Sequence, residues 1–145
     1  MHLSLKILHG GLIRATFDVA SGSGAFDKGN VLELDSAGEA KLSASSAYAA
    51  RGLAVEKQRS STATSADSLA GVPSGEKVSM LMDEAVVETD QITSGVSFKV
   101  NQAVYTDTSG DLTDTTNKAY DQVLGIALAD ADWTGTLKML FSVQY

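Results

Sequence analysis

The chain has 145 residues, the size of one domain, and 43% of them are hydrophobic, which is enough to bury a core. The net charge is −7 and the 11 basic residues are dispersed, so a phosphate backbone would be repelled and we expect no nucleic-acid partner. Cysteine is absent from the sequence, which excludes disulfides, thiolate catalysis and Cys-ligated zinc. No run approaches the roughly 20 apolar residues of a membrane span, and we expect neither a signal peptide nor a membrane partner.

The N-terminal segment, residues 1–24, predicts an arm. Leu3, Leu5 and Ile7 alternate with polar residues, which favours a strand with one apolar face. A second short apolar run is followed by Ser-Gly-Ser-Gly at residues 21–24, which is typical of a flexible linker. We therefore predict an extended N-terminal arm and linker over residues 1–24, followed by a single β domain over residues 25–145.

The β domain contains an internal repeat, because residues 31–55 recur at residues 103–128. Three residues return 72 positions later: Asp35 as Asp107, Gly38 as Gly110, and Tyr48 as Tyr120. The offset then slips by one, so that Gly-Leu-Ala at 52–54 matches Gly-Ile-Ala at 125–127. We place the two copies at residues 28–82 and 99–145, and we expect them to form two similar halves.

Each copy predicts a strand, a D-x-x-G turn, a second strand and a returning G-[LI]-A strand. An Asp at the first turn position accepts backbone N–H bonds, and the Gly takes the positive φ that closes the turn. The small residues of the G-[LI]-A segment indicate a strand that neighbouring backbone approaches closely. Residues 47–50 and 117–122 could each form one helical turn, and we expect Tyr48 and Tyr120 to pack on the core.

The remaining segments complete a pattern of short strands. Residues 58–68 are polar and rich in Ser and Thr, which predicts a surface loop. Further strands are predicted within residues 78–87, 96–100 and 137–145. Turn signals recur about every ten residues, so the sequence favours an all-β sandwich or barrel of short antiparallel strands.

Catalytic patterns are weak. His2 and His9 both lie in the predicted arm, where no rigid frame would hold a base. A G-x-S-x-G elbow is absent from the sequence. Pairs of acidic residues could suggest a glycosidase, but few aromatic residues are available to line a sugar cleft, and solubilising charges explain the pairs better. These pairs are Asp83 with Glu84, Glu88 with Asp90, and Asp130 with Asp132. We predict that the protein is not an enzyme.

An acidic segment at residues 107–114 superficially resembles a calcium loop. It lacks the D-x-[DN]-x-[DN]-G spacing and the closing Glu, and its counterpart in the first copy keeps only the Asp and Gly that a turn needs. We therefore predict no metal among Asp107, Asp111 and Asp114, and no cofactor.

Candidate contact residues lie at both ends of the chain. Trp133 follows an acidic turn, where an isolated tryptophan is either a lid on the core or an anchor in an interface. The apolar residues of the predicted arm could add a strand to an exposed sheet edge. The candidates for capsid or inter-subunit contact are Leu3, Leu5, Ile7, Leu8 and Trp133.

Residues 28–57 and 99–140 each contain the same module: a strand, a D-x-x-G hairpin, a small linker and a G-[LI]-A strand. This module resembles that of tailed-bacteriophage capsid decoration proteins, also called cement or head-stabilising proteins. This resemblance implies a homotrimer that binds the major capsid protein on the outer surface of the virion and stabilises the mature head after synthesis in the host cytoplasm. The Ser/Thr-rich insertion at residues 58–68 departs from some members.

Two other functions remain as alternatives. A carbohydrate-binding or adhesion module of a virion fibre or cell surface would present aromatic side chains on a flat β face, and this chain has few. A small hydrolase of the jelly-roll type would need a histidine in the folded part of the chain, where the sequence has none beyond the predicted arm.

Overall fold

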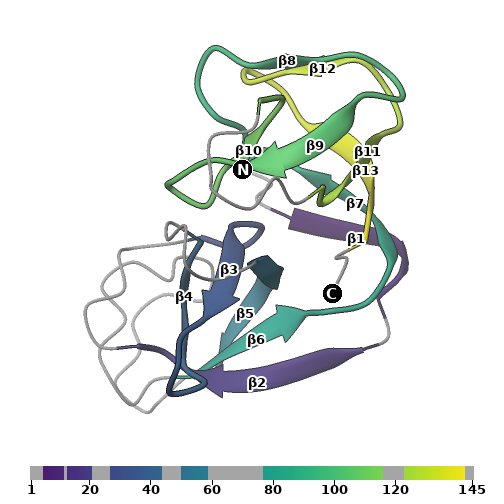
Figure 1. Ribbon diagram of the computed structural model, residues 1–145. Coiled ribbons are helices and arrows are strands. Elements are labelled where there is room, and N and C mark those ends of the chain that lie inside the picture. Colours follow the sequence, from purple (N-terminus) through teal and green to yellow (C-terminus); the bar gives the residue numbers. More distant parts are fainter. Residues whose placement is uncertain are drawn as a thin grey trace.

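The computed structural model describes residues 5–11, 13–20, 27–43, 50–58, 77–115 and 123–142. These residues form strands, turns and loops without a helix, which confirms the predicted all-β class (Figure 1). No segment of the described ranges therefore forms a helix that could cross a membrane. The strands are β1 (Leu5–Gly10), β2 (Arg14–Asp18), β3 (Val31–Leu34), β4 (Ala40–Leu42), β5 (Ala50–Gln58), β6 (Lys77–Leu81), β7 (Ala85–Thr89), β8 (Ser97–Phe98), β9 (Ala103–Thr106), β10 (Leu112–Thr113), β11 (Gly125–Ala127), β12 (Ala131–Asp132) and β13 (Leu137–Phe141).

The strands form two antiparallel sheets and a small ribbon. The five-stranded sheet has the order β2-β6-β5-β3-β4, and the six-stranded sheet has the order β1-β7-β13-β11-β9-β10. The ribbon pairs β8 with β12 and lies at the top of Figure 1, with the six-stranded sheet next to it and the five-stranded sheet below. One core cluster contains Leu53 and Leu81 from the lower sheet together with Val104 and Phe141 from the upper sheet. The two sheets therefore share a core.

The two sheets also share a strand order. The order β2-β6-β5-β3-β4 corresponds position by position to β7-β13-β11-β9-β10. The pair β2–β6 has the same register as the pair β7–β13. In each pair the first residue of one strand lies opposite the last residue of the other: Arg14 opposite Leu81, and Ala85 opposite Phe141. The equivalent strands thus begin at β2 and β7, ahead of the predicted repeat boundaries at residues 28 and 99.

The D-x-x-G turns have the predicted hydrogen bonds. Asp35 Oδ1 accepts the N–H groups of residues 37 and 39, both at 2.9 Å, and Gly38 has a φ of 77°. Asp107 Oδ1 accepts the N–H groups of residues 109 and 111 at 2.7 and 3.0 Å, and Gly110 has a φ of 78°. The assignment of both turns from sequence is confirmed.

A second pair of equivalent turns, at residues 27–30 and 99–102, precedes β3 and β9. Asn30 Oδ1 accepts the N–H of Asp27 at 2.8 Å, and Gln102 Oε1 accepts the N–H of Lys99 at 2.9 Å. The third residue of each turn has a positive φ and donates its N–H to the G-[LI]-A strand at 2.8 Å, Gly29 to Ala54 and Asn101 to Ala127. Sequence comparison missed this turn because its side chains differ between the copies while the backbone geometry is kept.

The described part of the predicted arm belongs to the sheets. β1 pairs with β7, β2 pairs with β6, and the side chains of Leu5 and Ile7 pack against the core. This differs from the extended arm expected from sequence. The physical reason is that a short alternating strand gains main-chain hydrogen bonds and apolar burial when it pairs with an open sheet edge of its own chain.

Other sequence predictions fall partly outside the described residues. Ala50 begins β5 instead of ending a helical turn. The rest of the predicted turns, at residues 47–49 and 117–122, lies outside the described ranges, and so do residues 59–68 of the predicted loop. The same is true of Leu3, Tyr48, Tyr120 and Tyr145.

The glycines of the two G-[LI]-A strands lie directly under neighbouring backbone. A Cβ atom at Gly52 would be 2.2 Å from the carbonyl oxygen of Leu81, and one at Gly125 would be 2.2 Å from that of Leu140. Both distances are far below van der Waals contact. The prediction of close backbone approach at these strands is therefore confirmed, and the glycine is needed for sheet geometry in both copies.

We expect Gly52→Ala and Gly125→Ala each to lower the free energy of unfolding by roughly 1–3 kcal/mol, because the added methyl group must push a paired strand away. Gly135→Ala is the matched control, since the nearest atom to its Cβ would be 3.9 Å away. Urea denaturation of the three variants measures the difference. Equal stability of all three would contradict the close approach.

Candidate interaction surface

The candidate interaction surface lies at the end of the six-stranded sheet, where the β8–β12 ribbon is attached. It consists of residues 96–102 and 128–136, which we call the tip. Ala131 lies opposite Phe98 in the ribbon. The Phe98 side chain is 1% exposed and belongs to the shared core. Burial of this one ring fixes the ribbon to the sheet, because removing so large an apolar surface from water is strongly favourable.

Three large apolar side chains of the tip are exposed. Val100 is 52% exposed, Leu128 40% and Trp133 48%. Their backbone is nevertheless held in place, because the Trp133 N–H donates to Val96 O at 2.9 Å and the Leu128 N–H donates to Lys138 O at 2.8 Å. The tip thus presents apolar groups to solvent from a fixed backbone.

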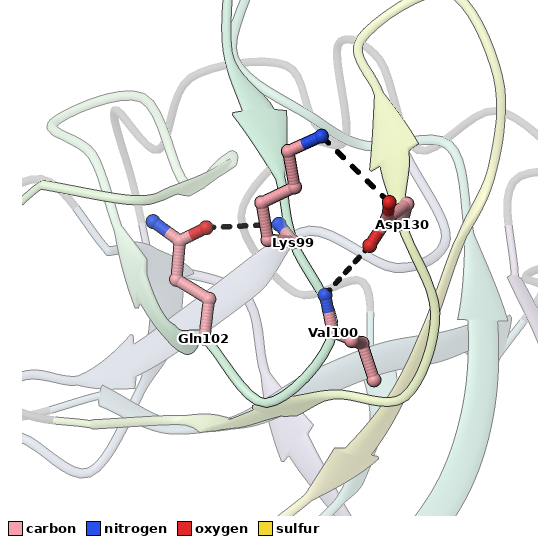
Figure 2. A network of polar contacts seen from close by, with 4 residues as sticks. All are labelled: Lys99, Val100, Gln102 and Asp130. Carbon is pink, nitrogen blue, oxygen red and sulfur yellow. Dashed lines mark hydrogen bonds and ion pairs between the residues drawn. The ribbon is translucent and has the colours of Figure 1, made fainter.

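A polar network fixes the loop that carries Val100 (Figure 2). Asp130 Oδ1 accepts the N–H of Val100 at 2.9 Å, and Asp130 Oδ2 lies 3.7 Å from Lys99 Nζ. The Lys99 and Asp130 side chains are 80% and 62% exposed, so this ion pair contributes at most about 1 kcal/mol. The charge-assisted bond to the backbone N–H is the contact that positions Val100.

Asp132 caps the next turn of the tip. Its Oδ1 accepts both the hydroxyl and the backbone N–H of Thr134, and these two bonds lower the pKa of the Asp132 carboxyl. The N–H of Gly135 donates to the carbonyl of Asp132 at 3.0 Å. Asp130 and Asp132, which the sequence offered as a pair of catalytic carboxylates, thus have structural contacts: Asp130 holds the turn at residues 99–102, and Asp132 holds the turn that follows β12.

Two shallow hollows lie on the six-stranded half of the molecule. One of about 280 Å³ is lined by Ser97, Phe98, Lys99, Asp130, Ala131 and Asp132. The other, of about 350 Å³, is lined by His9, Gly10, Asp83, Glu84, Ala85, Val86 and Leu140. The second brings together His9 and the pair Asp83 and Glu84, which sequence analysis considered separately, and Asp83 Oδ1 accepts the N–H of Glu84 at 2.7 Å.

The structure separates the contact residues proposed from sequence. Leu3 lies outside the described residues, and Leu5 and Ile7 are half-buried against the core. Leu8 is 37% exposed and sits at a register shift between Ile7 and His9 in the pairing of β1 with β7. Trp133 lies on the tip. Sequence reasoning missed Val100 and Leu128, because a hydrophobic residue beside a strand is ordinarily expected to be buried.

A buried polar cluster joins the two halves at the start of β3. Asn30 is 5% exposed, and its Nδ2 donates to Asp111 Oδ1 at 2.8 Å, to Gly110 O at 3.2 Å and to Gln91 Oε1 at 3.3 Å. The N–H of Val31 also donates to Gly110 O, at 2.8 Å. We call Asn30, Val31, Gly110 and Asp111 the junction. It binds the D-x-x-G turn of the second copy to the first strand of the first copy.

The carboxylates around the junction have structural roles. Asp107 Oδ2 accepts the hydroxyl of Thr93 at 2.6 Å, and its Oδ1 caps the turn. Burial raises the pKa of Asp111, and the nearby Asp107 and Asp27 raise it further, while the hydrogen bond from Asn30 acts in the opposite direction. Within the described ranges, no group of three or more histidines or carboxylates is placed to hold a metal ion.

No protein-family model and no curated protein matches the chain.

We expect Asn30→Ala to lower the free energy of unfolding by roughly 1–3 kcal/mol, because three acceptors would lose a buried donor. Gln102→Ala is the matched control, since Gln102 has the same place in the equivalent turn and its side chain bonds only to the Lys99 N–H among the contacts described. Its loss should cost about 1 kcal/mol or less. Urea denaturation measures both variants. Equal losses of unfolding free energy would show that the junction contacts of Asn30 add no stability beyond that of the local turn.

We expect Asp111→Asn to be at least as stable as the wild type at neutral pH. Because the pKa of Asp111 is raised in the folded chain, ionisation of this carboxyl opposes folding above its folded pKa, and this opposition disappears as the pH falls below the usual value of 3.8. Asparagine removes the charge and keeps an oxygen that can accept from Asn30. Thermal melting from pH 3 to pH 8 should show an advantage for the variant that shrinks as the pH falls. An advantage that grows toward low pH would have the wrong sign.

Proposed function

We propose that the chain is a structural protein that binds the outer surface of a tailed-phage capsid, with the major capsid protein as its partner, and stabilises the mature head. The observation that carries this proposal is the tip, where Val100, Leu128 and Trp133 expose apolar surface from a fixed backbone. Exposed apolar groups of this kind mark protein contact sites when they gather on one surface.

The tip has the physical properties of a docking surface. Tryptophan is enriched among residues that dominate binding energy, because it buries a large area while few rotamers are frozen. The main-chain bonds of Leu128 and Trp133 hold the loops before any partner arrives, so little conformational entropy is lost on docking. The polar rim formed by Lys99, Asp130 and Asp132 suits the wet periphery of a protein interface.

The proposed state is a homotrimer on the capsid, located in the virion after synthesis in the host cytoplasm. Three tips on one particle would bind the shell at the same time, so modest single-site affinities would multiply through effective concentration. We propose a binding role without catalysis, because each acidic residue described at the tip and junction takes part in a structural hydrogen bond. The contact is assigned to the tip and not to β1, since Leu5 and Ile7 are packed within the chain.

We expect Trp133→Ala to weaken binding to capsids by about tenfold or more, because an interface tryptophan commonly contributes over 1.4 kcal/mol. The measurement is co-sedimentation of the purified chain with undecorated shells assembled from the major capsid protein of the same phage. Ile13→Ala is the control, since Ile13 is 61% exposed but lies outside the tip, between β1 and β2. Equal retention of both variants, or no binding of the wild type, would refute the assignment.

A carbohydrate-binding or adhesion module is the second candidate, favoured by the exposed ring of Trp133. Sugar-binding faces usually present several aromatic rings, and Trp133 is the one exposed aromatic side chain in the part of the chain that the structure describes. Protein contact is therefore the first choice. Titration of the chain with glycans of the host surface separates the two, because a capsid-binding protein would leave such glycans unbound.

A further inference from the structure

The first half packs on the second through a row of three apolar side chains. Leu53 lies directly opposite both Val31 and Leu81, so the row runs across β3, β5 and β6. All three side chains are fully buried and belong to the core cluster that contains residues of both halves. Their neighbours along the strands alternate to the other side of the sheet, into the separate core of the first half. We call Val31, Leu53 and Leu81 the covered row.

The second half has an equivalent row that is only partly buried. Ile126 lies directly opposite both Ala103 and Leu140, so this row runs across β9, β11 and β13 in the same register. The three side chains are apolar and belong to neither core cluster of the described residues. Leu140 and its cross-strand neighbour Val86 also line the hollow of about 350 Å³. We call Ala103, Ile126 and Leu140 the open row.

The junction shows what covers the Val31 end of the covered row. Gly110 O accepts the Val31 N–H at 2.8 Å, and Asp111 Oδ1 accepts Asn30 Nδ2 at 2.8 Å. A Cβ atom on Gly110 would lie 3.0 Å from Val31 O, so the D-x-x-G turn of the second half sits directly on β3. A turn of one half and a row of the other therefore form the contact between the halves.

The remaining turn and the remaining row have no such contact within the described residues. Gly38 has a φ of 77°, as in the other turn, but no described atom beyond its chain neighbours would lie within 4 Å of a Cβ there. Glu39 follows this turn as Asp111 follows the other, and each N–H bonds to the aspartate of its own turn. Beside the open row, Gln102 has the place of Asn30, and its Nε2 has no acceptor among the described contacts.

We propose that copies of this chain associate head to tail, with the D-x-x-G turn of the first half of one copy seated on the open row of the next. The Gly38 carbonyl then faces the Ala103 N–H, and the Glu39 carboxylate accepts from Gln102 Nε2. The open row is buried between the copies, as the covered row is buried between the halves.

This inference rests on the proposed homotrimer, for which it supplies the contact. A contact between two different patches closes into a ring or extends as a filament. Three chains carry six halves, so a closed ring of three repeats the turn-on-row contact all the way round, alternately within a chain and between chains. No turn and no row is then left over.

The contact between copies is weaker than the junction. Asp114 takes the place of Leu42, whose Cδ2 would be the atom nearest to a Cβ on Gly110, and Ala103 is smaller than Val31. The strand β1, which packs against the shared core, has no described counterpart beside β2. Less apolar surface is therefore buried, which suits subunits that associate reversibly.

The first experiment is cross-linking, to which a chain without cysteine is suited. Glu39→Cys and Gln102→Cys are made as separate chains, because the side chains at the equivalent junction positions are 2.8 Å apart. A short bismaleimide should join the two variants when they are mixed and should join neither to itself, since a head-to-tail contact brings different residues together. A chain with both substitutions should be cross-linked into a closed trimer, which denaturing electrophoresis detects.

The second experiment places a charge on the open row. Ile126→Asp should weaken self-association about tenfold or more, because the carboxylate would be buried between copies. Trp133→Asp is the matched control, since it adds the same charge to the tip and should associate as the wild type does. Sedimentation equilibrium over a range of protein concentrations measures association, and thermal melting checks that both variants are folded. The cross-linking result does not depend on either variant.

The outcomes separate this contact from the rest of the proposed function. Cross-linking of each cysteine variant with itself, none in the mixture, or equal association of the two aspartate variants would overturn the head-to-tail contact. A trimer with any of these results would stand without this interface, and a monomeric wild type would overturn both. Expected cross-linking by a chain that does not bind shells would support the contact and refute capsid binding.

Discussion

The relative position of the two sheets depends on the backbone of Gly110. Its carbonyl accepts hydrogen bonds from the Val31 N–H and from Asn30 Nδ2. A Cβ atom at this position would lie 2.6 Å from Leu42 Cδ2 and 3.0 Å from Val31 O, so only glycine allows the turn to seat against β3. With the turn seated, residues of both sheets close on one apolar core, and burial of that core supplies the dominant stabilisation. The junction is thus the point at which two similar halves become one body.

The sequence repeat predicts the fold class, both D-x-x-G turns and the close approach at Gly52 and Gly125. These features depend on local chemistry, because a turn carboxylate and a positive φ leave a signature in a few adjacent residues. The pairing of β1 with β7 and of β2 with β6 was not predictable in the same way. It depends on which sheet edges remain open after the rest of the chain has folded, and strand alternation alone does not carry that information.

The candidate site was only partly predictable for a similar reason. Trp133 is visible in the sequence because it is the one tryptophan of the chain. Val100 and Leu128 carry no such signal, because Val100 lies in a turn whose side chains differ between the copies and Leu128 directly follows the apolar strand β11. Asn30 was missed because a single asparagine before a strand is common, and its buried partners come from 61 to 81 residues further along the chain.

Equivalent positions in the two halves serve different purposes. Asn30 and Gln102 make the same local bond in the same turn, but Asn30 also reaches into the junction, while Gln102 lies beside the exposed network of Lys99 and Asp130. One copy of the turn thus holds the halves together, and the other supports the tip. The sheet edges differ as well, since β7 pairs with β1, whereas among the described strands none is paired along that side of β2 and Ala40 of β4 bridges to Val19 just beyond its end. This asymmetry, and not the shared strand order of the two sheets, separates the turn that holds the sheets together from the turn that supports the exposed tip.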